Sequence, residues 1–369
     1  MSNDSETKSI ADISEHLKGQ AGNYFPELGG SEVMVTLLSE RRRTNSALYR
    51  FELAGHGVRR NVLVKIPSLR GGVLRDKRPY FLPETDQLIK YRVQYAAMIA
   101  LHARFGNLTD PRFGAVRPFE LLPDYDAFVM EEIAGKTIKQ LLRKSNRLQS
   151  PLGIGELRGV FENTGAWLRE FHALPVDPNT EVIHSNSVDL VDRIEKLTGF
   201  LERAINDENF FRPLAERAGE VARNTLKDPL PLGVRFGDFG LTNVLVSTDN
   251  RITGIDTQAI WYTPIYEDIG YFLTGLKTYR PQVLSLGLAF GTDRIGMLES
   301  AFLEGYFQTD PIPLREIRVY EIARLLERWS AKSVRAHSQQ GVGAKFGTAI
   351  LNHFMRRTIL SLLKEASKL

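Results

Sequence analysis

The order of its secondary-structure signals constrains the fold of this chain most, because strand patterns fill the first third and helical patterns follow. Short apolar runs between turn or charged residues predict three strands within residues 32–67. Apolar residues at three- and four-residue spacing predict one helix over 83–106, and two more strands follow at 116–122 and 126–135. This order predicts an α+β fold in which a small antiparallel sheet precedes a larger, mainly helical part.

After Gly135, apolar residues recur at helical spacing through most of the chain, and a predicted strand pair within residues 234–258 interrupts them. The predicted helices cover residues 137–144, 156–175, 187–204, 209–226, 317–334 and 349–366. We expect three parts along the chain. They are a polar N-terminal leader at 1–28, a sheet lobe with one helix (the N-lobe) at 29–132, and a helical lobe (the C-lobe) at 133–369.

Composition limits the chemistry and the setting of the protein. Of its 369 residues, 43% are hydrophobic and 25% charged, as in an ordinary globular protein. It has no cysteine, which excludes disulfides, thiolate metal sites and cysteine nucleophiles. No apolar run reaches the roughly 18 residues that a membrane span needs, and the polar, acidic N-terminus lacks a signal-peptide pattern. We therefore expect a cytoplasmic protein without a membrane span.

The distribution of charge says more about partners than the net charge does. A net charge of +4 is small for this length, so we expect no nucleic-acid partner. The segment 313–369 nevertheless has eleven Lys and Arg against four Asp and Glu, a local excess of +7. Positive charge is thus concentrated at the C-terminal end.

Four polar residues from three separate segments have the types that phosphoryl transfer from ATP requires, where a protein mainly positions groups and stabilises charge. Lys65 ends the apolar run NVLVKI and can present its ammonium to nucleotide phosphates. Asp238 and Asn243 share one short loop, in which the carboxylate can orient an acceptor hydroxyl while the amide oxygen reaches Mg²⁺. Asp256 follows a predicted hairpin turn and can bind the same metal with a charged oxygen. The alternative is that Asp and Asn simply favour turns between surface strands.

The spacing of these residues decides how the loop is interpreted. Asp238-Phe239-Gly240 has the letters of the metal-binding triplet of protein kinases, but Asn243 stands five residues after Asp238. D-x-x-x-x-N is the spacing of a kinase catalytic loop, so the metal-binding aspartate is Asp256, which follows Ile255. With the loop FGDFGLTN the chain resembles the aminoglycoside phosphotransferase and choline kinase-like family, whose loop reads H-G-D-x-x-x-x-N. Further matching segments are NVLVKIP, FVMEEIAGKTI, GAWLREFHALP and TPIYEDIGYFL.

The resemblance implies a bilobal protein-kinase-like fold and an ATP- and Mg²⁺-dependent transfer of a phosphoryl group to a small-molecule hydroxyl. It implies that main-chain groups at Glu131 and Ile133 hold the adenine and that Asp268 supports the catalytic loop by hydrogen bonding. Two of the departures from the family pattern concern residues of the predicted site. Phe236 replaces the loop histidine, which would leave the loop held by packing alone. The glutamate that pairs with the lysine is Glu84 in our preferred assignment, although another register places Gln94 there.

The acceptor is predicted from charge. In this family the helical end of the large lobe helps build the acceptor site, where a local positive excess repels a polycationic aminoglycoside. We expect a small hydroxylated acceptor, namely a sugar, a phosphosugar or a glycan-type molecule. Two alternatives within the fold are an aminoglycoside or amino-alcohol kinase and a nucleotide-binding, pseudokinase-like regulatory protein. A basic module that binds anionic polymers is a third, but it leaves the loop spacing unexplained.

Overall fold

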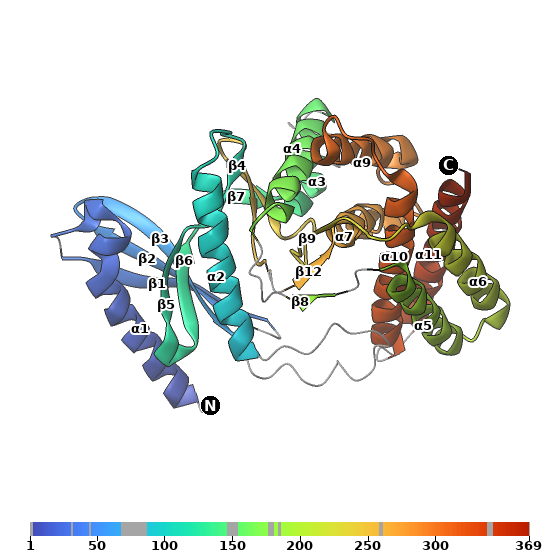
Figure 1. Ribbon diagram of the computed structural model, residues 1–369. Helices are drawn as coiled ribbons and strands as arrows, with labels where there is room; N and C mark the ends of the chain where they lie inside the picture. The colour runs from blue at the N-terminus through green and yellow to red at the C-terminus, as the bar shows by residue number, and fades with distance from the viewer. Residues whose placement is uncertain are drawn as a thin grey trace. The chain divides into compact units, whose positions relative to one another are not determined.

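The computed structural model describes residues 3–30, 32–43, 46–67, 87–145, 154–175, 181–183, 186–257, 261–337 and 342–368. By their contacts the described residues form two compact units (Figure 1). The N-terminal unit contains the described residues up to 67 together with 87–107 and 115–134. The C-terminal unit contains 108–114 and the described residues from 135 onward. The division after residue 134 lies next to the expected lobe boundary after residue 132, but the segment 108–114, expected in the N-lobe, belongs to the C-terminal unit.

The N-terminal unit is built on a five-stranded antiparallel sheet with the strand order β1-β2-β3-β6-β5. Alternating apolar residues and turn residues between them explain these strands, so the predicted small antiparallel sheet is confirmed. The strands are β1 (Met34–Arg43), β2 (Ser46–Gly55), β3 (Val58–Pro67), β5 (Pro118–Leu122) and β6 (Ala127–Glu131).

One face of this sheet is covered by α1 (Asn3–Tyr24), and the polar leader predicted at residues 1–28 is therefore wrong. The helix has a narrow apolar stripe at three- and four-residue spacing, which the polar residues around it conceal in the sequence. The stripe packs into the same core as the buried face of β2 and β3, and a short 3₁₀ turn, Pro26–Leu28, follows the helix. The stripe consists of Ile13, Leu17, Ala21 and Tyr24.

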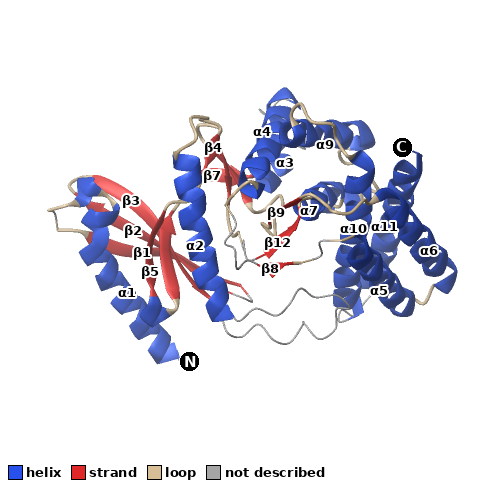
Figure 2. Ribbon diagram, in the orientation of Figure 1, coloured by secondary structure: helices blue, strands red, loops and turns tan. Residues whose placement is uncertain are grey.

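The other face of the sheet carries α2 (Gln87–Gly106), and Figures 1 and 2 show the sheet between the two helices. Side chains alternate between faces along a strand. Val62 and Val64 therefore lie in the core with α1, while Lys65 faces α2. On the α2 side the ring of Tyr95 lies 6.0 Å from the ring of Phe128, whose residue is the register partner of Lys65.

The C-terminal unit is mainly helical, as predicted, and holds two small sheets. One has the order β4-β11-β10-β7, and the other β8-β12-β9. Their strands are β4 (Phe113–Gly114), β7 (Gly135–Thr137), β8 (Glu181–Val182), β9 (Leu232–Val234), β10 (Val244–Ser247), β11 (Ile252–Gly254) and β12 (Trp261–Pro264). The helices are α3 (Ile138–Ser145), α4 (Ile154–His172), α5 (Ser187–Ile205), α6 (Glu208–Thr225), α7 (Tyr266–Lys277), α8 (Arg280–Leu284), α9 (Gly291–Phe307), α10 (Leu314–His337) and α11 (Val342–Lys368).

Two glycines let α4 and α9 approach closely in this unit. A Cβ atom on Gly305 of α9 would lie 1.8 Å from the main-chain oxygen of Glu162, and one on Gly165 of α4 would lie 1.9 Å from that of Phe302. No larger residue fits either position without moving a helix. This crossing fixes α4, whose C-terminal half supports the loop described next. No helix in the described part of the chain is both long and apolar enough to cross a bilayer.

Candidate active site

The buried carboxylate of Asp268 holds the loop between β9 and β10 in place by hydrogen bonds. Asp268, on the first turn of α7 and 1% exposed, accepts hydrogen bonds from the main-chain N–H groups of Phe236 at 2.6 Å and Gly237 at 2.9 Å. Gly237 has a φ of +89°, which glycine adopts without strain and which helps both N–H groups face one carboxylate. The expectation that Asp268 supports this loop by hydrogen bonding is confirmed.

His172, at the end of α4, completes the support of Asp268. Its Nε2 lies 3.3 Å from Asp268 Oδ2, and its Nδ1 lies 2.6 Å from the hydroxyl of Tyr306 on α9. Burial alone would raise the pKa of Asp268, but the hydrogen bond and charge of His172 and the charge of Arg235 outweigh it and hold the pKa below its ordinary value. The expectation that the loop rests on packing alone is therefore wrong, since buried hydrogen bonds hold it.

Phe236 adds packing to these hydrogen bonds. It is fully buried, and its ring lies 5.1 Å from those of both Phe171 and Phe239 and 6.0 Å from that of Trp167. Close packing extends to Gly254 on β11, where a Cβ atom would lie 2.4 Å from the Trp167 ring. The main chain of the loop thus makes the polar contacts, while its two phenylalanines anchor it in an aromatic core.

Asp238, the predicted catalytic residue, is half-buried in this loop. Its Oδ1 accepts a hydrogen bond from the hydroxyl of Tyr271 on α7, and its main-chain oxygen accepts one from Asn243 Nδ2 at 2.9 Å. Burial raises the pKa of the Asp238 carboxyl above its ordinary value, and the negative charge of Asp256 adds to that rise, although the Tyr271 hydrogen bond opposes it. A carboxylate has about four lone-pair positions, so it can still accept a hydrogen bond from a ligand.

Asn243 and Asp256 flank the hairpin of β10 and β11, which pairs Val244 with Gly254. The N–H of Ile255 donates to the main-chain oxygen of Asn243 at 2.8 Å, so the two predicted metal ligands sit beside one another in the hairpin. Asp256 adopts a φ of +67°, a left-handed conformation that aspartate tolerates better than most residues.

These two residues form a donor set that fits Mg²⁺. Both offer oxygen, which Mg²⁺ prefers, and in phosphoryl-transfer sites Mg²⁺ binds to one or two carboxylates and completes its shell with phosphates and water. The amide of Asn243 uses its nitrogen on Asp238, which leaves its oxygen for a cation. Within the described ranges no group of three or more His, Cys, Asp or Glu side chains forms a metal site.

Lys65, Glu131 and Ile133 belong to the N-terminal unit. Lys65 Nζ donates to Gln94 Oε1 on α2 at 2.9 Å. Glu84, our preferred partner for Lys65, lies outside the described residues. Gln94, which the alternative sequence register places beside Lys65, accepts this hydrogen bond. Glu131 ends β6, and its N–H donates to the main-chain oxygen of Arg117 at 2.9 Å. Ile133 lies in the link that follows this strand.

Three residues near Asp238 were missed by the sequence analysis. Tyr271 lies three residues after Asp268, so helical spacing could have placed it beside the loop. Arg328 on α10 has its guanidinium carbon 5.6 Å from the centre of the Tyr271 ring. Arg235, three residues before Asp238, is 3% exposed. No sequence pattern marks the two arginines, because the surroundings of each depend on how the helices pack around it.

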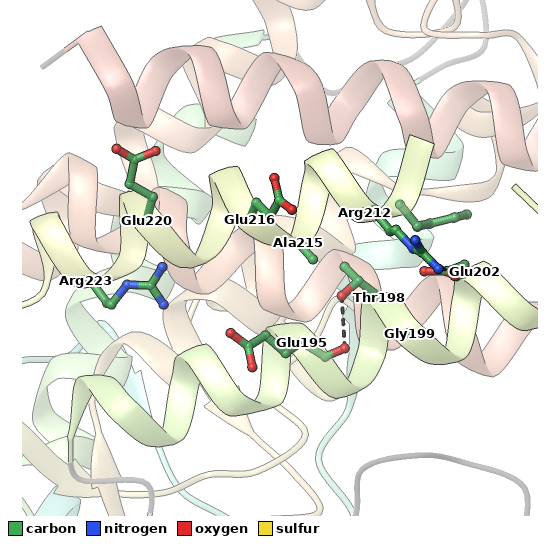
Figure 3. Close-up of a pocket in the computed structure, with 10 residues that line it drawn as sticks. Glu195, Thr198, Gly199, Glu202, Arg212, Ala215, Glu216, Glu220 and Arg223 are labelled. Atoms are coloured by element: carbon green, nitrogen blue, oxygen red, sulfur yellow. Dashed lines mark hydrogen bonds and ion pairs between the residues drawn. The ribbon is translucent and has the colours of Figure 1, made fainter. Parts of the chain in front are cut away.

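A separate cavity of about 580 Å³ lies in an open groove along α5 and α6 (Figure 3). None of the residues above lines it. Four glutamates and two arginines do: Glu195, Glu202, Glu216, Glu220, Arg212 and Arg223. The groove is therefore distinct from the loop and hairpin that carry Asp238.

Solved structures share this fold at low sequence identity. An ethanolamine kinase from Plasmodium vivax aligns with a TM-score of 0.52 at 14% identity, over 94% of this chain and 89% of the other. An amicoumacin kinase in complex with AMP-PNP, Ca²⁺ and Ami gives 0.53 at 14%, over 96% and 95%. An aminoglycoside phosphotransferase from Alicyclobacillus acidocaldarius gives 0.51 at 12%, over 90% and 93%. These alignments establish a protein-kinase-like fold.

The sequence itself identifies the family within that fold class. Residues 53–308, more than half of the chain, match the phosphotransferase enzyme family. The protein belongs to this family. A search of curated protein sequences finds no match. The resemblance inferred from the loop FGDFGLTN is thus confirmed.

Proposed function

We propose that the protein transfers the γ-phosphoryl group of ATP to a hydroxyl of a small molecule, with Mg²⁺ as the metal. The observation that carries this proposal is a half-buried carboxylate, Asp238, on a loop whose main chain is held by Asp268. Membership of the phosphotransferase family supports it, as do the AMP-PNP and Ca²⁺ bound to the amicoumacin kinase of similar fold. A cytoplasmic setting, where ATP is abundant, is part of the proposal.

The proposed reaction forms one bond and breaks one. The acceptor oxygen bonds to the γ-phosphorus, while the bond from that phosphorus to the oxygen bridging to the β-phosphate breaks, and its electron pair leaves with ADP. Asp238 orients the acceptor hydroxyl and takes up its proton. A pKa raised by burial makes this carboxylate a better proton acceptor than an exposed one. Asn243 and Asp256 would hold the Mg²⁺ that neutralises phosphate charge.

Residues of the N-terminal unit are proposed to bind the nucleotide. Lys65 would neutralise the phosphates, and the main chain at Glu131 and Ile133 would hold the adenine. In the sequence-based assignment, Glu84 orients Lys65. Gln94 is a candidate for that role because it accepts the observed hydrogen bond.

The acceptor is proposed to be a sugar, a phosphosugar or a glycan-type molecule. The positive excess of segment 313–369 supports this class over aminoglycosides and amino alcohols, although proteins of similar fold include an ethanolamine kinase and an aminoglycoside phosphotransferase. A second candidate is a regulatory protein that binds nucleotide without efficient turnover. It is favoured by Phe236, which stands where the family's loop has histidine.

The test is ATP consumption with Mg²⁺ across sugars, sugar phosphates, amino alcohols and aminoglycosides. We expect at least one class to stimulate turnover by wild type, and Asp238→Ala to reduce that turnover by about 10²- to 10⁴-fold, the usual contribution of a general base. Asp249→Ala, in the exposed turn of the same hairpin, is the matched control and should keep full activity. Turnover that survives Asp238→Ala contradicts the proposal. ATP binding without turnover for any class favours the regulatory candidate.

A further inference from the structure

Buried arginines of the C-terminal unit differ in whether they have an anionic partner. A guanidinium taken out of water is stable only when carboxylates compensate its charge. Three of the arginines meet this condition, and their ion pairs tie α10 to α5, α7 and α9. The pairs are Arg193 with Glu267 and Glu327, Arg318 with Glu299 and Glu321, and Arg324 with Glu267 and Glu327.

Arg235 is the exception among the buried arginines that the structure describes. It is 3% exposed, its Nε and Nη1 are buried without a hydrogen-bond partner, and no carboxylate of the described chain lies within ion-pair distance. The neighbouring carboxylate of Asp268 is already engaged by the loop N–H groups and His172. Burial and the positive charge of Arg324 lower the pKa of Arg235. The charges of Glu267 and Asp268 oppose this shift only in part. A buried cation without a carboxylate in ion-pair distance calls for an anion.

A second arginine connects this region with the reaction centre. Arg328 is half-buried, lies one helical turn after Arg324 on α10, and donates from Nη1 to the hydroxyl of Thr278 at 2.8 Å. Among the described residues it has no carboxylate partner. Arg328 and Arg324 lie 5.6 and 5.7 Å from the centre of the Tyr271 ring, and the hydroxyl of Tyr271 donates to Asp238. One tyrosine therefore links the proposed general base with two guanidinium groups.

Two arginines without an ion pair near Tyr271 favour an anionic ligand. Arg193 and Arg324 form ion pairs with Glu267 and Glu327. Arg235 and Arg328 form no ion pair among the described residues, and the charges of Asp268 and Asp238 act on them only through space. Two guanidinium groups are therefore left without an ion pair in a partly desolvated region, where electrostatic interactions are strong. A phosphate or carboxylate would complete the unpaired guanidinium groups, which a cationic acceptor cannot do.

We propose that the acceptor is a hydroxylated molecule that carries a phosphate or carboxylate group, and that Arg328 binds this group while Asp238 receives the hydroxyl. Arg235 contributes its buried charge to the same anion, and Tyr271 positions Asp238 relative to Arg328. This inference rests on the proposed phosphoryl transfer, which it narrows to anionic acceptors. Phosphate and carboxylate groups bind guanidinium through the same charge-assisted hydrogen bonds. The experiment therefore tests an acceptor of each class.

The kinetic test compares wild type, Arg328→Gln, Arg328→Lys and the control Arg357→Gln, which removes an exposed arginine from α11. The acceptors are glucose 6-phosphate, glucuronate, glucose and glucosamine.

We expect wild type to prefer one of the two anionic acceptors, glucose 6-phosphate or glucuronate. Arg328→Gln should raise KM for that anion about 10- to 100-fold, the range for loss of a charge-assisted hydrogen bond. The KM values for glucose and ATP should stay unchanged, Arg328→Lys should restore part of the affinity, and Arg357→Gln should match wild type.

A binding measurement separates this inference from the proposed function. Calorimetry with inorganic phosphate and with acetate, without nucleotide, should show binding to wild type and Arg357→Gln that is weakened about tenfold or more in Arg328→Gln. Arg328-dependent anion binding with no turnover for any acceptor keeps the anion site and overturns phosphoryl transfer. Turnover of glucose or glucosamine with no anion binding overturns the anion site alone. An equal loss of kcat for all acceptors in Arg328→Gln also overturns it, because Arg328 would then act on the transferred group.

Discussion

Asp256 provides the sharpest test of the metal site at the scale of single residues. Asparagine has nearly the same shape but no charge, and the hairpin bond between Ile255 and Asn243 does not involve the side chain. We expect Asp256→Asn to lower kcat by at least about 10²-fold, in line with the loss of one preorganised electrostatic group. The free energy of unfolding should change by less than about 1 kcal/mol, since Asp256 is half-buried.

The measurement is steady-state turnover at increasing Mg²⁺ concentration together with urea unfolding. Partial recovery of the Asp256→Asn variant at high Mg²⁺ would agree with a weakened metal site. Normal activity at ordinary Mg²⁺ would show that Asp256 is not a metal ligand.

The loop residues could be identified from the sequence because their arrangement is local. Asp238 and Asn243 lie five residues apart, and a short hairpin returns Asp256 to Asn243, so spacing alone places them together. Arg235 and Arg328 could not be identified in this way. Their surroundings depend on how α10 packs on α7, and no sequence pattern encodes which of several arginines lacks a carboxylate.

Asp268 links three elements, because its carboxylate joins α7 to the loop before β10 and to His172 on α4. Its pKa lies below the ordinary value of 3.8, so the ionised side chain stabilises the fold. This stabilisation is complete above pH 3.8 and is lost as the pH falls through the lower pKa of the folded state. We expect Asp268→Asn to reduce the free energy of unfolding at pH 7 by about 1–3 kcal/mol.

Urea unfolding of wild type and Asp268→Asn between pH 7 and pH 3 checks this. The difference between the two proteins should be largest at neutral pH and shrink below pH 3.8. Asp192→Asn, which alters an exposed ion pair on α5, should behave as wild type. A difference that stays constant with pH would mean that charge on Asp268 is not what stabilises the loop.

The crossing of α4 and α9 allows a matched pair of glycine substitutions within one helix. A Cβ atom at Gly305 meets the main chain of Glu162 at 1.8 Å, whereas one at Gly296, also on α9, meets nothing within 4 Å. We expect Gly305→Ala to destabilise the protein by about 1–3 kcal/mol through overpacking. Gly296→Ala should be neutral or stabilise it by up to about 1 kcal/mol, because alanine favours helix. Equal unfolding midpoints for the two variants would contradict this account of the crossing.

At the scale of the whole molecule, α1 is part of the N-terminal fold. Leu17 is fully buried in its core, while the neighbouring Lys18 is exposed. Leu17→Ala should cost about 2–5 kcal/mol, the range for a buried leucine, and Lys18→Ala should cost almost nothing. Thermal unfolding measures both. If α1 were a detached leader, the two substitutions would be equally harmless.

The order of strands and helices, and hence the fold class, follows from the sequence because hydrophobic periodicity is a repeated signal over many residues. A single short stripe such as that of α1 is a weaker signal. Ile13, Leu17, Ala21 and Tyr24 stand among polar residues, and only the sheet face that they cover reveals their role.

The position of α1 also bears on how relatives of this protein are recognised and compared. The region shared with the family begins at residue 53, inside β2, so α1, β1 and most of β2 lie before it. Those segments nevertheless cover and extend the sheet that bears Lys65. A protein trimmed to the shared region would lose one edge of the sheet and expose the apolar face beneath α1. The unit that folds is therefore longer than the unit that sequence comparison detects.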